Sequence, residues 1–212
     1  MSKINTYQEE GAFANVLQPG LITLSGALVL SLATYNANLL IIDPDGAART
    51  VTLYPEADAK GLILTILNQG EAAETLTVND DSASPVLVGY VHAGEAAVFA
   101  CDGTSWVKLT RAANFGLPVA VTASGTIALT AASPRLQQID GNGSARDVTL
   151  PALSAMRPGD GFLIDNSSST AIALTVKDSG GSTVQSLAQH RGAKIVSTGA
   201  AWVSFPYSRD GS

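Results

Sequence analysis

Residues 49–53 read Arg-Thr-Val-Thr-Leu, and residues 146–150 read Arg-Asp-Val-Thr-Leu, 97 positions later. Other landmarks return in the same order. Residues 76–78 return as 174–176 at an offset of 98, and residues 103–107, which contain a tryptophan, return as 199–203 at an offset of 96. An insertion in either copy would have shifted every later landmark by its length. The near-constant offset therefore indicates two copies of one structural unit of roughly 90 residues.

Each copy reads as a series of short strands. Runs rich in Val, Ile, Leu and Thr alternate with turn residues such as Asp43-Pro44-Asp45-Gly46 and Asn79-Asp80-Asp81-Ser82, at a spacing of about 8–12 residues. Val51 and Leu53 fall on one face of their strand, and helix signals are poor. The sequence predicts an all-β chain built from two tandem, homologous antiparallel β-domains of the sandwich or jelly-roll type.

The repeat also predicts the domain boundaries. We expect an extended N-terminal arm over residues 1–20, a first domain over 21–109, a linker over 110–118, a second domain over 119–206 and a C-terminal tail over 207–212.

The arm has no counterpart in the second copy and shows no strand alternation. Its apolar residues are scattered among polar ones, namely Tyr7, Phe13, Val16 and Leu17. A terminus that frays in solvent is one interpretation. Because a purely solvated tail has no need of apolar side chains, we expect these four residues to bind a partner on which the arm becomes ordered.

Composition excludes several classes of function. Apolar residues make up 46% of the chain and charged residues 14%, with 12 basic against 18 acidic side chains and a net charge of −6. Nucleic acids and anionic membranes require clustered Lys and Arg, so neither is an expected partner. Cys101 is the only cysteine, which rules out an intrachain disulfide, and residues 1–5 lack the apolar region of a signal peptide. We expect a soluble protein made in a cytoplasm.

The sequence predicts no catalytic residues, no metal site and no cofactor. The two histidines, His92 and His190, lie two residues before Gly94 and Gly192 and are predicted to be the same position in both copies. Neither has the further ligands that zinc requires. Cys101 follows an apolar run, which favours a buried side chain over a reactive thiol. Asx turns explain the Asp and Asn clusters more simply than a calcium site does.

The two tryptophans are more informative. Trp106 and Trp202 each follow a glycine turn and precede the last strand of their copy, in a chain with only 6% aromatic residues. We expect both to be packing anchors, and sugar stacking is the alternative.

The order of landmarks resembles a module of tailed-bacteriophage virion proteins, which occurs in tail-fibre segments and in capsid decoration proteins. The residues that carry this resemblance are Thr50 to Leu53 with Pro55, Gly61 to Asn68, Leu76 to Val78, Gly94, and Asp102 to Val107. The second copy departs from the pattern, because Pro151 directly follows Leu150 and no Asp occurs in the stretch Gly199 to Trp202. The resemblance covers residues 22–205, and it implies a symmetric oligomer, often a trimer, without catalytic residues.

Two functions fit this resemblance. A capsid decoration, or cement, protein would bind the major capsid protein on the outside of the head, and a tail-fibre or receptor-binding protein would contact glycans on the host surface. Tail fibres carry long repetitive shafts, whereas this chain comprises an arm and two small domains. We therefore expect a virion decoration protein that forms homotrimers. We also expect the arm and first domain to bind the shell and the second domain to project outward.

Overall fold

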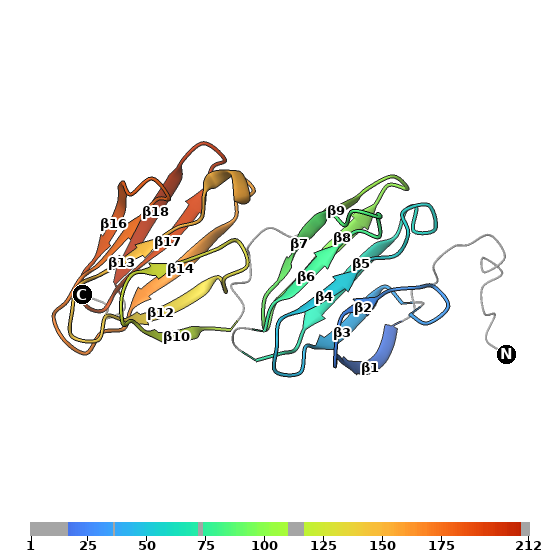
Figure 1. Ribbon diagram of the computed structural model, residues 1–212, viewed down its shortest axis with the longest axis horizontal. Coiled ribbons are helices and arrows are strands. Elements are labelled where there is room, and N and C mark those ends of the chain that lie inside the picture. Colours follow the sequence, from blue (N-terminus) through green and yellow to red (C-terminus); the bar gives the residue numbers. More distant parts are fainter. Residues whose placement is uncertain (1–16, 36, 72–73, 110–116, 209–212) are drawn as a thin grey trace. The chain divides into compact units, whose positions relative to one another are not determined.

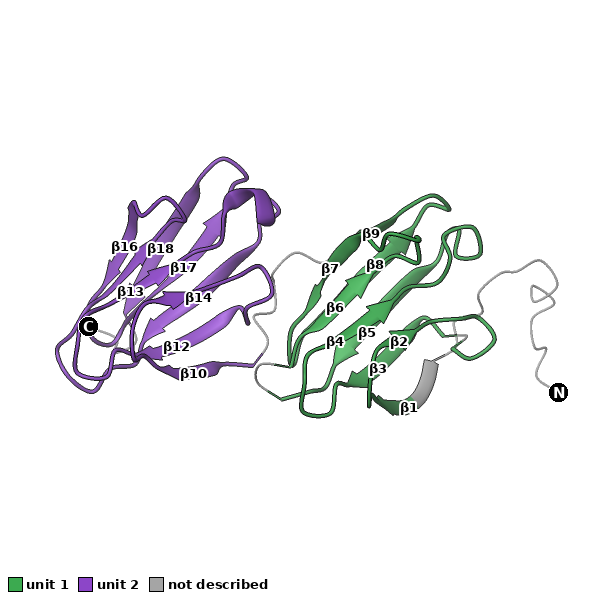
Figure 2. Ribbon diagram, viewed as in Figure 1, with its two compact units in different colours: residues 1–110 green, residues 111–212 purple. Residues whose placement is uncertain are grey.

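The computed structural model describes residues 17–35, 37–71, 74–109 and 117–208. By their internal contacts the residues form two compact units, 1–110 and 111–212 (Figures 1 and 2). The described residues form strands and one short 3-10 turn at Leu153–Ala155, with no α-helix among them. The predicted all-β class is confirmed. No helix within these described ranges is long and apolar enough to span a membrane.

The first unit contains two sheets. Its five-stranded sheet has the order β1-β3-β5-β8-β9, and its four-stranded sheet has the order β2-β4-β6-β7. The bounds are β1 Leu17–Thr23, β2 Leu28–Val29, β3 Leu39–Asp43, β4 Arg49–Thr52, β5 Ile63–Asn68, β6 Leu76–Asn79, β7 Leu87–Val91, β8 Ala96–Cys101 and β9 Trp106–Lys108.

The second unit repeats this arrangement strand by strand. Its sheets have the orders β10-β12-β14-β17-β18 and β11-β13-β15-β16, so each strand corresponds to the one nine places earlier. The bounds are β10 Val119–Thr122, β11 Ile127–Ala128, β12 Leu136–Asp140, β13 Arg146–Thr149, β14 Gly161–Asn166, β15 Leu174–Lys177, β16 Thr183–Leu187, β17 Arg191–Ser197 and β18 Trp202–Ser208.

The strand directions correct the prediction of antiparallel sheets. The first three strands of every sheet pair in parallel, as in β1-β3-β5 and β2-β4-β6. Only the later pairs β5-β8, β8-β9 and β6-β7 are antiparallel, and the second unit behaves in the same way. The cause is the path of the chain, which crosses to the other sheet after each of the first strands. The next strand in a given sheet therefore returns in the same direction.

The turns after β3 and β12 are corners between the two sheets, whereas the turns after β6 and β8 join neighbouring antiparallel strands of one sheet. Asp43 and Asp140 end β3 and β12, and their side-chain Oδ1 atoms accept hydrogen bonds from the backbone N–H two residues later, at 2.9 Å in both units. The two residues after Pro44 and after Gly141 have positive φ in both corners, with Asp45 at 56° and Asn142 at 52°. In such Asx turns the Asp side chain bonds its own backbone, so the chain changes direction without ladder hydrogen bonds to another strand.

Two predicted boundaries also change. Strand β1 begins at Leu17 and pairs with β3, so residues 17–20 belong to the first sheet and not to the arm. Strand β18 continues to Ser208, so residues 207 and 208 belong to the last sheet and not to the tail. Because β1 pairs in parallel with β3, no hairpin turn in the sequence marks where β1 begins. Residues 110–116, most of the predicted linker, lie outside the described residues.

A buried asparagine ties the two sheets together in each unit. Asn68, at the end of β5, donates from Nδ2 to the carbonyls of Glu74 (2.6 Å) and Val91 (2.9 Å), and its Oδ1 accepts from the N–H of Gly70 (2.9 Å). Its counterpart Asn166 makes the same set of bonds, to the carbonyls of residues 172 and 187 and from the N–H of residue 168. Both side chains are fully buried, and each unit packs its own hydrophobic core around them.

Candidate functional site

The outward side of the five-stranded sheet in the first unit is the candidate site. Inward residues such as Leu40, Ile42 and Leu64 are buried, and their neighbours along each strand point outward. The strand register places most outward residues in three rows across the sheet, and Thr23 and Asp43 form a further, polar row at one end. We call the set of three rows the first outer face, and it consists of Leu21, Ile41, Leu67 and Ala96, then Leu39, Thr65, Val98 and Leu109, then Ile63, Ala100 and Val107.

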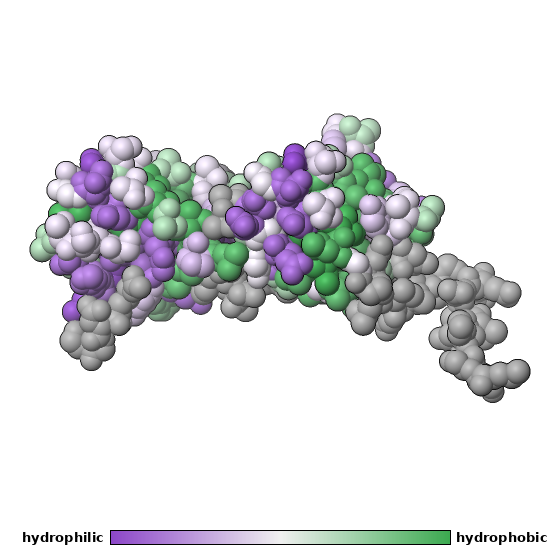
Figure 3. Space-filling view, turned by 90° about the horizontal axis from the view of Figure 1, so that it is seen from below, coloured by the Kyte–Doolittle hydropathy of each residue, from purple (hydrophilic) through white to green (hydrophobic). Residues whose placement is uncertain are grey.

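The first outer face is uncharged. Ten of its eleven residues are apolar and the other is Thr65, although several are well exposed, with Leu21 at 52%, Ile63 at 57% and Leu109 at 53%. Figure 3 shows hydrophobic residues gathered on the visible surface of the first unit. In a strand with one solvated face, buried apolar residues normally alternate with polar residues that point to the solvent. We therefore expect this apolar face, which extends across five strands, to be shielded from water in the functional protein.

The second unit has polar residues at three of the eleven corresponding positions. Register pairing makes Gln138, Asp165 and Lys194 the counterparts of Ile41, Leu67 and Val98. The carboxylate of Asp165 accepts a hydrogen bond from the Tyr207 hydroxyl on the same sheet. Apolar residues such as Val203 and Phe205 remain on this face, but charges now lie between them. The two copies therefore share a fold and differ in the chemistry of this one surface.

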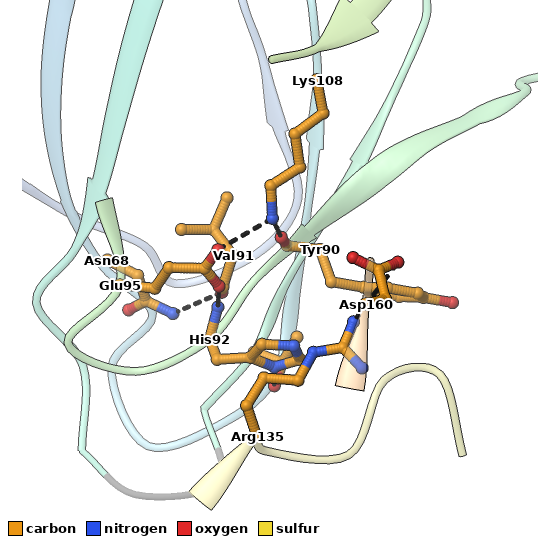
Figure 4. A network of polar contacts seen from close by, with 9 residues as sticks. Asn68, Tyr90, Val91, His92, Glu95, Lys108, Arg135 and Asp160 are labelled. Atoms are coloured by element: carbon orange, nitrogen blue, oxygen red, sulfur yellow. Dashed lines mark hydrogen bonds and ion pairs between the residues drawn. The ribbon is translucent and has the colours of Figure 1, made fainter. Parts of the chain in front are cut away.

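A polar network lies at the end of the sandwich in the first unit (Figure 4). The carboxylate of Glu95 accepts from the backbone N–H of His92 at 2.9 Å and pairs with the Lys108 ammonium at 2.8 Å. Lys108 also donates to the carbonyl of Tyr90, and His92 Nδ1 lies 3.3 Å from the Thr75 hydroxyl. Because Glu95 is buried and both of its oxygens are engaged, this cluster fastens β7, β8 and β9 together. It has the contacts of a structural network.

The polar contacts of the second unit are of another kind. The Arg135 guanidinium lies 5.2 Å from the centre of the Phe162 ring and 4.0 Å from the Asp160 carboxylate. The Phe162 ring in turn lies 6.2 Å from the ring of Trp202. A guanidinium over an aromatic face contributes on the order of 1 kcal/mol. Nowhere in the described ranges do three or more His, Cys, Asp or Glu side chains gather as metal ligands would.

The predicted equivalence of His92 and His190 is wrong. His190 has φ 56° and donates its backbone N–H to the carbonyl of Asn166, whereas Gly94, with φ 72°, donates to the carbonyl of Asn68. His190 is thus the counterpart of Gly94, and it is exposed, while His92 is buried. The reason is the hairpin between the third and fourth strands of the small sheet, which is two residues shorter in the second unit.

The turn before each tryptophan uses a different side-chain hydrogen-bond acceptor in each unit. In the first unit, Asp102 Oδ1 accepts from the N–H groups of Thr104 and Ser105, both at 2.8 Å, and from the Thr104 hydroxyl. In the second unit the hydroxyl of Thr198 accepts from the N–H groups of Ala200 and Ala201. Thr198 therefore replaces the Asp that the sequence pattern lacks in the second copy.

We expect the Asp102 carboxyl to titrate well below its usual range. Hydrogen bonds from the backbone and side chain of Thr104, and then from Ser105, lower its pKa from 3.8 to about 2. A depressed pKa stabilises the turn above the unfolded pKa near 4, and this contribution is lost as the pH falls through about 2. The amide NMR shifts of Thr104 and Ser105 should move with a midpoint near 2. Those of Ala200 and Ala201, whose acceptor is a hydroxyl, provide the control, and a midpoint near 4 at Thr104 would contradict the assignment.

The tryptophans and the cysteine occupy core positions. Trp106 is buried and donates its indole N–H to the carbonyl of Tyr54 at 2.9 Å, and Trp202 packs against the core of the second unit. Both therefore serve as the packing anchors that their positions predicted. Cys101 is buried, and burial raises the pKa of its thiol, so that less of the reactive thiolate is formed.

None of the four residues predicted to bind a partner is among the eleven residues of this site. Tyr7, Phe13 and Val16 lie outside the described residues, and Leu17 is the first residue of β1. The first outer face was missed, although a signal for it exists. Residues 39–42 and 96–100 are apolar at every position, where a strand with one solvated face would alternate.

Comparisons with known proteins find little that resembles this chain. No family model matches it, and no curated protein matches it. Among solved structures, one described as "Structure of a chaperone-substrate complex" is similar with a TM-score of 0.34 and 14% sequence identity. That similarity covers 87% of this chain, which spans 35% of the length of the other chain.

Proposed function

We propose that this protein is a non-enzymatic structural protein of a tailed-bacteriophage virion. In this role it forms homotrimers and decorates the outside of the head by binding the major capsid protein. The observation that carries the proposal is the first outer face, an uncharged sheet surface that the second unit lacks. Enzyme sites are concave and combine apolar walls with a few converging polar groups. A flat apolar face suits assembly with other proteins.

The two units then have different tasks. The first unit carries the surface to be covered and follows directly after the N-terminal arm, so it is the unit that we assign to assembly and to the shell. The second unit has Gln138 and the exposed Lys194 on the equivalent face, which suits contact with solvent, and its Asp165 is buried beneath the Tyr207 hydroxyl. This division agrees with the expectation that the second unit projects outward from the head.

Head binding should depend on the arm and not on the second unit. We expect purified protein to co-sediment with phage heads from which this protein is absent. A variant without residues 2–16 should lose at least about 10-fold in affinity for these heads, because an arm that becomes ordered on binding contributes apolar contacts. This deletion leaves β1, which begins at Leu17, complete. A chain that ends at residue 118 is the matched control and should keep its affinity. Unchanged binding without the arm, or binding by the second unit alone, would contradict the assignment.

A groove in the second unit favours the alternative function, a tail-fibre or receptor-binding protein. It has a volume of about 390 Å³ and lies between β16 and β18, where Gln185, Arg191 and Tyr207 combine amide, guanidinium and aromatic groups. Such groups can bind sugar hydroxyls and rings. If the protein binds host-surface glycans in solution, and replacing Arg191 with Ala abolishes that binding, the receptor-binding function is preferred over decoration.

A further inference from the structure

We infer that the first outer face is the surface through which copies of this chain bind one another. This inference rests on the self-association in the proposed function and adds the residues that mediate it. The partner is a second copy, which presents the same face. In a trimer the three copies turn this face toward the common axis, so the contact brings together sheets that each lack charge at all eleven of these positions.

The chemistry of the face favours a permanent contact. Transient interfaces are about as polar as the rest of a protein surface, whereas the interfaces of obligate oligomers are more apolar. A decoration protein must stay in solution until it meets a head, so a face with Ile63, Val107 and Leu109 exposed must be covered before that meeting. A second copy is always present and carries no charge that would be buried unpaired. The shell is present only later.

The second unit serves as an internal comparison. It has the same strand order, the same buried asparagine and the same corner turns, yet Asp165 and Lys194 interrupt its face. The fold alone therefore does not require an apolar outer face. What distinguishes the first unit is the loss of charge on this surface, which is the property that a contact between copies needs.

The size of the face fits the centre of such a contact. Strands lie about 4.8 Å apart and alternate residues about 6.7 Å apart, so five strands and three rows form a patch of about 20 by 15 Å. A stable interface takes about 800 Å² from each partner, with an apolar centre and a polar rim. The patch of about 300 Å² is comparable in size to the largest apolar patch on a typical monomer, which is often a functional surface, and it would form the centre of such an interface. Thr23 and Asp43, which pair at one end of the sheet, supply part of the rim.

Charged substitutions on the face test the inference directly. Ile63 and Val107 flank Ala100 on neighbouring strands and are 57% and 49% exposed, so lysines there leave the core of a single chain intact. In full-length protein without heads, the Ile63→Lys, Val107→Lys variant should sediment as a monomer at micromolar concentration where the native chain is an oligomer. We expect its dissociation constant to rise by about 100-fold or more, because like charges would meet.

The matched control carries Val29→Lys and Val86→Lys, at residues that are 66% and 61% exposed and lie outside the first outer face. It should keep the native mass. Circular dichroism checks that each variant is folded. If the double variant is not, Val98→Lys replaces it, because Lys194 occupies the equivalent position in a folded unit.

Three results would overturn the inference. One is a native chain that is monomeric at micromolar concentration, and another is a face variant that keeps the mass of the control. The third is a chain that associates only after residues 2–16 are removed, because the arm would then be what covers the face. A failure to bind heads leaves these masses unchanged, so the proposed decoration function can fail separately.

Discussion

Replacing Gly161 with alanine should unfold the second unit at temperatures where the first unit stays folded. Gly161 begins β14 at the centre of the five-stranded sheet, and a Cβ built there would lie 2.1 Å from the carbonyl oxygen of Ile195 and 3.0 Å from the Cα of Val196. Both contacts are with backbone, so no side-chain rotation relieves them. Glycine in a strand often marks such a close approach of another backbone.

The expected loss is about 4 kcal/mol, the range of severe single substitutions. For a unit of this size it lowers the unfolding midpoint by roughly 15–30 °C. Differential scanning calorimetry should show an early transition for the second unit only. Gly125→Ala is the control, since a Cβ there meets nothing within 4 Å, and it should leave both transitions in place. A Gly161→Ala protein that melts like the native chain would show that β14 and β17 are not paired in this register.

Replacing Asn68 with leucine should destabilise the first unit by about 3 kcal/mol. The change leaves the carbonyls of Glu74 and Val91 without their donor and the N–H of Gly70 without its acceptor, at a site with no solvent access. Each buried group left unsatisfied costs about 1–3 kcal/mol, and a partial rearrangement recovers some of that loss.

The duplicated fold supplies the companion variant. Asn166→Leu should cause an equal loss in the second unit, because Asn166 makes the same three hydrogen bonds. Asn79→Leu, at a half-buried position at the end of β6, is the control and should cost far less. Chemical denaturation of the three variants measures these differences. Equal stability of the Asn68 variant and the Asn79 variant would contradict the role of the buried amide.

The sequence predicted strands and turns well because both depend on local chemistry. The alternation in residues 49–53 and the turns at Asp43 and Asp102 occur where they were expected. Strand direction could not be predicted in this way, because a turn between two sheets uses the same Asp, Asn and Gly residues as a hairpin turn within one sheet. Only the long-range pairing of β1 with β3 and of β3 with β5 distinguishes the two.

The candidate site was missed for a related reason. Continuous apolar runs such as Leu39-Leu40-Ile41-Ile42 are compatible with a strand buried on both faces, and the sequence does not say what covers the second face. The histidine equivalence failed because the offset between the copies falls from 98 to 96 within one hairpin, where no landmark residue records the change. Spacing alone aligned His190 with His92, whereas hydrogen bonding aligns it with Gly94.

The central proposal, that this chain is a head-bound structural protein of a phage, is tested most directly by looking for it in purified virions of a phage whose genome encodes this sequence. A cryo-electron microscopy reconstruction of such a virion should show three copies around a common axis on the outer surface of the head, with the first outer faces turned toward one another and the second units outermost. Density for the chain at the tail tip, or a virion without it, would contradict the account.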